Sequence, residues 1–270
     1  MNSRDPVTLS TGQPIPDIQS LVDTRKLPIQ AVGVRSVKYP VLIQLEGQRV
    51  LPSVAEFEMT VYLPAEQKGT HMSRFIALLE EMQDQVITLQ AFRALVESML
   101  VKLDAHSGQI QMKLPYFLKK QAPISGVSSL LDYELELNGK VDEAGQMALW
   151  VTVVVPVTSL CPCSKKISDY GAHNQRSNVT AKVLVHGDLE VSELIRAIEK
   201  QASCELYGLL KRPDEKYVTE RAYDNPKFVE DMVRDVALAL DQFKQVKSYV
   251  VEAENFESIH NHSAYAKILK

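Results

Sequence analysis

The sequence predicts an α+β fold made of two modules, each an antiparallel sheet with a pair of helices on one face. Several segments alternate apolar and polar residues with a period of two, which is typical of strands with one buried face. Between them lie paired segments whose apolar residues recur at helical spacing. The order of strands, two helices and strands occurs twice along the 270 residues. A chain of this length suits two modules of about 125 to 140 residues each.

The first module is expected to cover residues 1–125 and to begin with a flexible polar tail. Its strands alternate in the way that Phe57, Met59 and Val61 do between Glu56, Glu58 and Thr60. Two consecutive amphipathic helices follow the first hairpin, and a further strand follows the helices. The predicted strands cover residues 30–45, 53–63 and 110–114, and the predicted helices cover residues 72–82 and 92–103.

The second module is expected to cover residues 126–270, after a linker at residues 119–126. Pro226 stands in the first turn of its last helix, a position where proline is tolerated. Cys204 falls inside the preceding helix and is expected to belong to the core. The predicted strands cover residues 131–137, 147–157, 179–185 and 246–253, and the predicted helices cover residues 191–210 and 226–243.

Composition argues against several classes of protein. The 30 basic and 34 acidic residues give a net charge of −4 at pH 7, so neither nucleic acid nor an anionic membrane is an expected partner. No segment approaches about 18 consecutive apolar residues, and the N-terminus lacks the apolar core of an export signal. We therefore expect a soluble, cytoplasmic protein. A disulfide between Cys161 and Cys163 would be strained, so reduced thiols are expected.

The most reactive side chains are concentrated in residues 160–177, directly after the most hydrophobic predicted strand. We expect this segment to be an irregular active-site loop held in place by that strand. Cys161 and Cys163 flank a single proline there, and His173 follows in a turn-like setting. The two cysteines could be metal ligands, a nucleophile pair or buried thiols. The proline and the flanking lysines disfavour buried thiols, because they keep the pair out of a packed helix.

Further candidate ligands lie later in the chain. His260 and His262 follow the last predicted strand, and their alternate spacing would direct both imidazoles to one side of an extended segment. Glu215 offers a carboxylate in the charged connector at residues 211–215. Thiolate, imidazole and carboxylate are the usual ligands of zinc and other transition metals. The alternative is that these three residues are ordinary surface residues.

Basic residues near the thiols could bind phosphate groups. Lys165, Lys166 and Arg176 cluster in the segment of the two cysteines. Arg74 lies near a predicted helix N-terminus, where main-chain N–H groups favour anions. Most basic residues are simply solvated, so only the clustering beside the thiols favours a binding role. The chain contains no glycine-rich phosphate loop of the P-loop or dinucleotide type.

Four motifs occur together in this chain. They read Gly-Thr-His-Met-Ser-Arg-Phe at residues 69–75, Leu-Cys-Pro-Cys-Ser-Lys at 160–165, Gly-Ala-His-Asn-Gln-Arg-Ser at 171–177 and Asn-Phe-Glu-Ser-Ile-His-Asn-His at 255–262. The combination resembles the prokaryotic type IB GTP cyclohydrolase I. The resemblance implies the tunnelling fold, in which tandem modules assemble into a barrel. It also implies a homo-oligomer, a tetramer, with active sites between subunits.

The resemblance further implies hydrolysis of GTP to 7,8-dihydroneopterin triphosphate and formate, the first step of folate and pterin biosynthesis. Water must attack C8 of guanine, and a bound divalent ion that generates hydroxide near neutral pH would serve this step. The implied ligands of a zinc, manganese or iron ion are Cys161, His173, Glu215 and His260, with Cys163 and His262 in reserve.

Roles for the remaining candidates also follow from the resemblance. Glu257 matches the glutamate that anchors the ring in tunnelling-fold enzymes, since a carboxylate can accept two parallel hydrogen bonds from guanine N1–H and the 2-amino group. A histidine free of metal, His262 or His71, could transfer protons at the opened ring. The expected catalytic residues are Cys161, Cys163, His173 and His262, and the expected GTP-binding residues are Glu257, Lys165, Lys166, Arg176, His71 and Arg74.

Two alternative functions stay open at this point. One is a different tunnelling-fold pterin or purine enzyme, such as a pterin synthase or a nitrile reductase with a cysteine nucleophile, and release of formate would separate it from a cyclohydrolase. The other is a non-catalytic metal-binding nucleotide module. Structural zinc sites have four protein ligands, commonly from paired C-x-x-C motifs, which this chain lacks.

Overall fold

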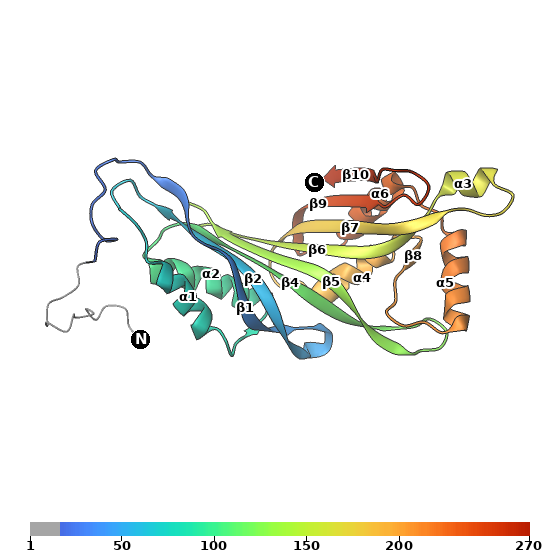
Figure 1. Ribbon diagram of the computed structural model, residues 1–270, viewed down its shortest axis with the longest axis horizontal. Coiled ribbons are helices and arrows are strands. Elements are labelled where there is room, and N and C mark those ends of the chain that lie inside the picture. Colours follow the sequence, from blue (N-terminus) through green and yellow to red (C-terminus); the bar gives the residue numbers. More distant parts are fainter. Residues whose placement is uncertain (1–16) are drawn as a thin grey trace.

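The computed structural model describes residues 17–270, so the first 16 residues of the expected N-terminal tail lie outside it. The described chain forms a ten-stranded sheet in the order β10-β9-β7-β6-β5-β4-β2-β1-β3, and the short strand β8 pairs with β6. Figure 1 shows this sheet running along the whole molecule, with α1 and α2 near one end and α3 and α5 at the other. The predicted α+β class is confirmed.

The N-terminal half follows the predicted order of elements. β1 and β2 form the expected antiparallel hairpin, and two helices precede β4. Thr88 starts the second helix, because its hydroxyl accepts a hydrogen bond from the Ala91 N–H at 3.0 Å. The elements are β1 (Ile29–Gln44), a 3-10 turn (Glu46–Gln48), β2 (Val50–Leu63), α1 (Met72–Glu81), β3 (Val86–Ile87), α2 (Leu89–Leu103) and β4 (Gly108–Gln121).

The C-terminal half contains the predicted strands, together with two helices and two strands that the sequence pattern did not predict. Its helices α3 and α5 and its strands β8 and β10 were not expected. The elements are β5 (Ser128–Val141), β6 (Met147–Leu160), α3 (Pro162–Ile167), β7 (Asn174–Val185), α4 (Val191–Glu199), β8 (Cys204–Glu205), α5 (Arg212–Asp224), α6 (Val229–Leu240), β9 (Val246–Asn255) and β10 (Ala264–Leu269).

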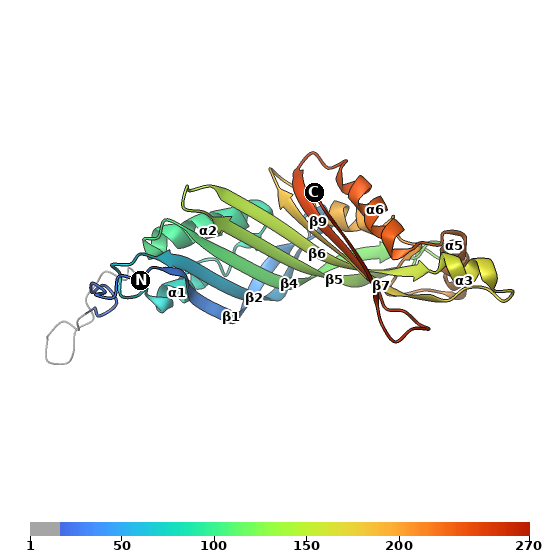
Figure 2. The ribbon, with the colours of Figure 1, turned by 90° about the horizontal axis from the view of Figure 1, so that it is seen from above.

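One face of the sheet carries the core. Phe57 stands opposite Met112, Met112 opposite Leu137 and Leu137 opposite Val151, and all four are almost completely buried. Directly opposed residues of neighbouring strands lie on the same face, so this face is apolar from β2 to β6. The helices α1, α2, α4 and α6 contribute to the same core. In Figure 2, α2 and α6 lie on the same side of the strands.

The expectation of an irregular segment over residues 160–177 is wrong in part. Pro162 to Ile167 form the short helix α3, and β7 begins at Asn174. The helix forms because Pro162 occupies its first turn and two lysines lie in its last turn, where they complement the helix dipole. Proline therefore starts a helix here rather than preventing one.

Several other boundaries differ from the prediction. The helix expected over residues 191–210 ends at Glu199, and Cys204, which is buried as expected, lies in strand β8 and pairs with Thr158. A short apolar segment suits a helix or a strand equally well, and periodicity alone does not distinguish them. Residues 212–215 form the first turn of α5 and Lys211 is its N-cap, so this segment is not a loop. Pro226 precedes α6 by three residues and does not stand in its first turn. The strand β9 is followed by β10, so His260 and His262 do not follow the last strand.

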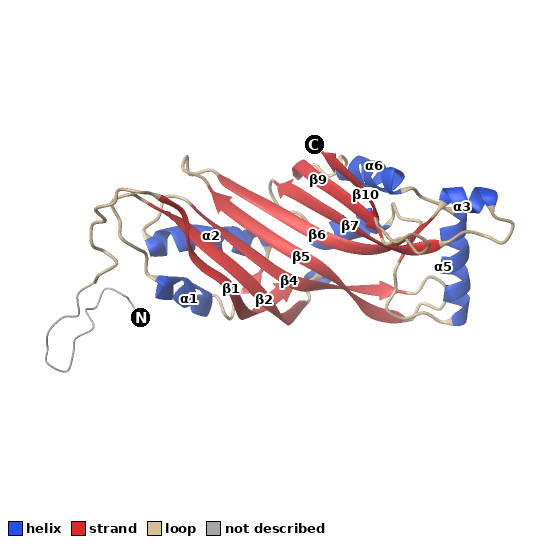
Figure 3. Cartoon of the chain, turned by 45° about the horizontal axis from the view of Figure 1, so that its top comes forward, coloured by secondary structure: helices blue, strands red, loops and turns tan. Residues whose placement is uncertain are grey.

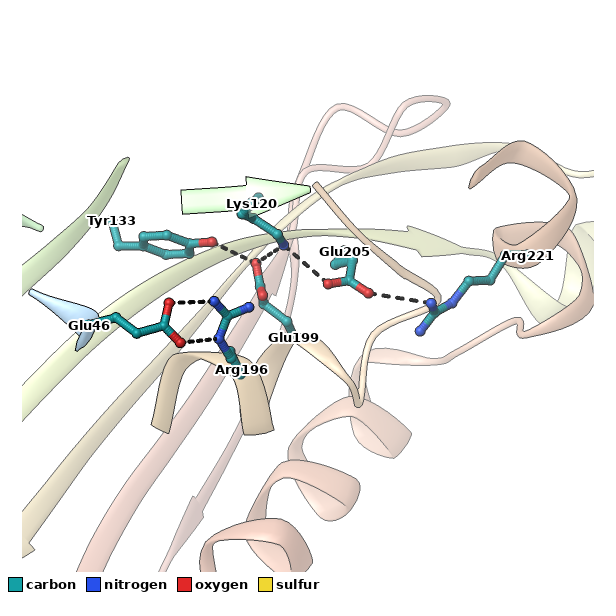
Figure 4. Close-up of polar contacts among 7 residues, drawn as sticks. All are labelled: Glu46, Lys120, Tyr133, Arg196, Glu199, Glu205 and Arg221. Atoms are coloured by element: carbon teal, nitrogen blue, oxygen red, sulfur yellow. Dashed lines mark hydrogen bonds and ion pairs between the residues drawn. The ribbon is translucent and has the colours of Figure 1, made fainter. Parts of the chain in front are cut away.

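The linker expected at residues 119–126 is not a separate segment: residues 119–121 end β4, and the rest belong to the turn between β4 and β5, which pair from Gly108 to Val141. Lys120 is only 3% exposed, and its ammonium contacts the buried Glu199 at 2.6 Å and Glu205 at 3.2 Å. Figure 4 shows Tyr133 and Arg221 extending this network. Burial raises the pKa of Glu199, although the contacts with Lys120 and Tyr133 act to lower this pKa. The two halves thus share one sheet and a buried ion pair, and the division at residue 125 stays a prediction.

None of the helices among residues 17–270 is long and apolar enough to cross a membrane.

Asp214 joins the start of α5 to the β4–β5 turn. Its buried carboxylate accepts hydrogen bonds of 2.8 Å from the N–H groups of Ile124, Ser125 and Lys211, and one of 2.6 Å from the Ser125 hydroxyl. Burial alone would raise the pKa of Asp214, but these donors outweigh it and hold the pKa well below 3.8. The ionised carboxylate therefore stabilises this junction.

This arrangement predicts a pH-dependent loss of stability. A carboxyl group with a lowered folded-state pKa stabilises the protein fully above its unfolded pKa, and this contribution is lost as the pH falls through the folded-state value. We expect Asp214→Asn to lower the melting temperature by a few degrees at neutral pH. The difference from the parent should shrink between about pH 4 and about pH 2. Thermal unfolding followed across this range measures it, and a difference that does not change with pH would contradict the assignment.

Candidate active site

Three neighbouring strands of the C-terminal half bring their ends together at one corner of the sheet. Leu160, the last residue of β6, pairs with Asn174 at the start of β7, and Ser177 pairs with Asn255 at the end of β9. Cys161 therefore follows β6, and the segment with Glu257 follows β9. The pairing of β7 with β9 thus places Gln175 beside Glu257, although the two are about 80 residues apart in the chain.

A cavity of about 320 Å³ lies at this corner. This volume falls within the usual range of small-molecule sites. The N-terminal end of α6 forms one wall through Lys227, Phe228 and Glu230. The remaining walls bring together half of the residues predicted from the sequence: Cys161, Cys163, His173, Glu257, His260 and His262.

Cys161 occupies the N-cap position of α3. Its N–H donates to the carbonyl oxygen of His173 at 3.1 Å. The Ser164 N–H donates to the Cys161 Sγ at 3.5 Å. The Ser164 hydroxyl donates to the Cys161 carbonyl oxygen and accepts from the main-chain N–H of His173, both at 3.2 Å. These contacts fix the main chain of Cys161 relative to that of His173. Cys161 is half-buried, whereas Cys163, on α3, is exposed.

The histidine pair lies in the connection between β9 and β10. The rings of His260 and His262 stack, with centroids 5.2 Å apart and an interplanar angle of 19°. Both side chains are exposed and line the cavity. The two imidazoles thus lie together, but in a bent connection rather than in the extended segment for which the alternate spacing was expected to align them.

Three polar contacts orient the side chains of His173 and Glu257. The His173 Nδ1 lies 3.0 Å from the Gln175 Oε1 and 3.3 Å from the Ser258 hydroxyl. The Gln175 Nε2 donates to the Glu257 Oε1 at 3.5 Å. Glu257 is half-buried at the edge of the cavity. A carboxylate in this position can accept further donors from a ligand.

The donor atoms around the cavity suit a transition metal. Cys161, His173 and His260 offer sulfur and nitrogen, the donors that zinc and iron sites accept. Within residues 17–270, no three His, Cys, Asp or Glu side chains converge closely enough to hold an ion. Exposed side chains such as that of His260 change rotamer rapidly, so the donor set fits a metal without being assembled for one.

Glu215 does not line the cavity. It lies in the first turn of α5 with its side chain exposed. Figure 3 shows α5 beside α3, at the same end of the sheet as the cysteines. The carboxylate expected to complete the ligand set is thus near this end of the molecule but outside the walls of the cavity.

The predicted phosphate-binding cations also lie outside the cavity. The Lys165 ammonium donates to the Tyr223 carbonyl oxygen and lies 4.3 Å from the centroid of that ring, so it fastens α3 to α5. Lys166 and Arg176 are exposed. Lys227, which the sequence analysis did not single out, is the lysine that lines the cavity.

His71 and Arg74 lie at the start of α1, far from α3 in Figure 1. The His71 Nε2 is 3.2 Å from the Asp17 carboxylate. Arg74 donates to the Lys102 carbonyl oxygen at 3.4 Å. Within a single chain, neither residue can contact a ligand in the cavity between β6, β7 and β9.

Comparison with known proteins agrees with this chemistry. A family model described as type I GTP cyclohydrolase folE2 matches residues 15–266. The chain belongs to this family. It is 61% identical over 254 residues to the GTP cyclohydrolase FolE2 of Burkholderia ambifaria (strain MC40-6), with 94% of each chain covered. It is likewise 61% identical over 254 residues to the GTP cyclohydrolase FolE2 1 of Burkholderia cenocepacia (strain HI2424), again with 94% of each chain covered.

A solved structure shares the fold of this FolE2 family member. The uricase from Arthrobacter globiformis superposes with a TM-score of 0.52 at 8% sequence identity, covering 89% of this chain and 93% of that one. Uricase is a tunnelling-fold protein, so the predicted fold is confirmed. The resemblance to a GTP cyclohydrolase I is confirmed at the level of the FolE2 family.

Sequence reasoning missed four polar residues that line the FolE2 cavity: Gln175, Lys227, Glu230 and Asn255. Gln175 and Asn255 lie inside two of the quoted motifs, but their amide side chains are chemically less distinctive than the neighbouring imidazole and carboxylate groups. Lys227 and Glu230 lie at the start of α6, whose main chain is held to β6 because the Lys227 N–H donates to the Leu160 carbonyl oxygen at 3.1 Å. Only the fold brings these two residues beside the cysteines.

Proposed function

We propose that this protein is a metal-dependent GTP cyclohydrolase I that converts GTP and water to 7,8-dihydroneopterin triphosphate and formate. The observation that carries the proposal is the cavity in which Cys161, His173, His260 and Glu257 meet. It combines donors suited to a metal with a carboxylate suited to the guanine edge. Membership of the FolE2 family supports the same reaction.

The proposed metal ligands are Cys161, His173 and His260, with Glu215 as the fourth. A bound zinc, manganese or iron ion would supply a hydroxide near neutral pH for attack at C8 of guanine. The contacts of Ser164 hold the peptide groups of Cys161 and His173 in place for this role. Glu215 would have to reach the ion from outside the cavity walls of one chain.

Glu257 is the proposed guanine anchor. Its carboxylate would accept hydrogen bonds from N1–H and the 2-amino group, which distinguish guanine from adenine. His262 lines the same cavity and is the proposed proton carrier once His260 is held by the metal. Cys163 is the reserve ligand, because it lines the cavity from the exposed side of α3.

The residues outside the cavity fit an assembled enzyme. We propose a tetramer with active sites between subunits, so that His71 and Arg74 of one copy complete the site of another. Lys165, Lys166 and Arg176 are close in sequence to Cys163 and His173, which line the cavity. We propose that these three cations bind the triphosphate. Assignment to type IB and a cytoplasmic location stay predictions from the sequence.

Removal of the metal tests the proposed reaction. The protein is treated with a chelator and the chelator is then removed, so that magnesium bound to GTP is not affected in the assay. We expect the stripped protein to form no fluorescent pterin from GTP, and readdition of a divalent transition ion to restore activity. Manganese or iron is expected to restore more activity than zinc, because a carboxylate ligand weakens the preference for tetrahedral zinc. Full activity in metal-free protein would overturn the mechanism.

A further inference from the structure

Gln175 lies between the proposed metal ligand and the proposed guanine anchor. Its side chain is 8% exposed. The Oε1 atom is 3.0 Å from the His173 Nδ1, and the Nε2 atom is 2.9 Å from the Ser159 hydroxyl and 3.5 Å from the Glu257 Oε1. One buried amide thus contacts side chains on both sides of the cavity.

The chemistry of its neighbours determines how this amide is oriented. An ionised carboxylate only accepts hydrogen bonds, so the Gln175 atom that faces Glu257 must be the NH₂ group. The carbonyl oxygen then faces His173, and because this oxygen only accepts, the His173 Nδ1 must carry the proton. In this tautomer the lone pair of the imidazole lies on Nε2, where it is available to a metal.

The amide is itself held by a buried polar network. The Ser159 hydroxyl, which accepts from Gln175, is 2.8 Å from the Ser177 hydroxyl, and Ser177 donates to the Asn255 Oδ1 at 2.7 Å. Ser159, Ser177 and Asn255 are at most 3% exposed. These residues come from β6, β7 and β9, so the three strands together fix the position of Gln175. Buried networks in which every member is satisfied are rigid.

We propose that Gln175 is a positioning residue that joins the metal side of the site to the guanine side. It holds His173 in the tautomer that can bind a metal, and it orients the Glu257 carboxylate toward the ring edge of the substrate. The inference rests on the proposed function, because it assigns the metal to His173 and guanine to Glu257. Gln175 touches neither metal nor substrate in this role and acts only through these two residues.

Two double-mutant cycles test the inference by binding rather than by turnover. The first measures metal affinity, by competition with a chromogenic chelator, for the parent, Gln175→Met, His173→Ala and the double variant. The second measures GTP affinity by calorimetry on metal-stripped protein for the parent, Gln175→Met, Glu257→Ala and the double variant. Methionine keeps the length of the side chain but offers no amide, and Gln175→Ala replaces it if the methionine variant does not fold. Gln201→Met is the control, because the side-chain amide of Gln201 donates to the Ala197 carbonyl oxygen in α4 and does not line the cavity.

We expect Gln175→Met to weaken metal binding by about 10- to 100-fold and to weaken GTP binding at least several-fold. The double variant with His173→Ala should bind metal as weakly as His173→Ala alone, and the double variant with Glu257→Ala should bind GTP as weakly as Glu257→Ala alone. Gln175 acts through those residues, so its loss adds nothing once they are removed. Gln201→Met should match the parent in both assays. Additive losses in both cycles, or unchanged affinities in Gln175→Met, would overturn the inference and leave the proposed function standing. A parent that binds neither metal nor GTP would overturn the proposed function itself, and the inference with it.

Discussion

Cys161→Ala is expected to lower cyclohydrolase activity to less than about a tenth of the parent value, even with metal in excess. The substitution removes a proposed metal ligand from the end of β6. It removes little else, since Cys161 is half-buried and its Sγ accepts one hydrogen bond among the described residues, the 3.5 Å contact from the Ser164 N–H. The melting temperature should therefore change little. Pterin fluorescence and thermal unfolding of the same preparation measure the two effects.

Cys163→Ala shows which of the two thiols binds the metal. Cys163 lines the same cavity but is exposed on α3, so the loss of activity and metal affinity should be smaller there than at Cys161. Cys161→Ala with more than about a tenth of the parent activity, in protein of unchanged stability, would remove the residue from the metal site. A larger loss at Cys163 would assign the ligand role to that thiol.

Glu257→Gln is expected to cost about 2 to 4 kcal/mol of GTP binding, a loss of roughly 30- to 1000-fold in affinity. The structure explains the direction of the effect. Gln175 donates to the Oε1 of Glu257, so the new amide keeps its carbonyl oxygen toward Gln175 and turns its NH₂ group toward the substrate. That group would then face the 2-amino group of guanine, and two donors would oppose each other in a partly buried site.

Calorimetry with metal-stripped protein measures this loss without turnover. Inosine triphosphate lacks the 2-amino group, so the parent and the variant should differ less in their affinity for it. Glu254→Gln is the matched control, because Glu254 lies near the end of β9, next to Asn255 but on the other face of the sheet, and does not line the cavity. Equal affinities of the parent and Glu257→Gln for GTP would show that Glu257 is a surface carboxylate.

Most of the fold could be predicted from the sequence because its strands have one buried face. The strand expected over residues 53–63 is Val50–Leu63, and the helix expected over residues 92–103 is Leu89–Leu103. The helix α5 escaped prediction since only Asp214 and Ala222 are buried in it, and it therefore has no apolar stripe. Asp214 caps the start of this helix through the Lys211 N–H, and its bond from the Ile124 N–H is a tertiary contact that no local pattern reveals.

The site could be predicted only as far as its residues are chemically distinctive. Cys161 and His173 attract attention by their reactivity, and the motif with Glu257 by its resemblance to a known family. Gln175 has an ordinary amide side chain, and its importance follows from its burial and its two contacts. Glu215 shows the opposite limit, because its residue type suggested a ligand while the fold of one chain leaves it outside the cavity.

The buried contact between Lys120 and Glu199 constrains how the sequence can diverge. The two residues are 79 positions apart and lie in different halves of the chain. Removal of one partner leaves an uncompensated charge in the interior, whereas replacement of both by apolar residues of similar volume can be neutral. Substitutions at the two positions are therefore less harmful together than separately. Descendants of this sequence should retain the pair or lose it as a unit, and neither half can be exchanged for that of a relative without regard to the other.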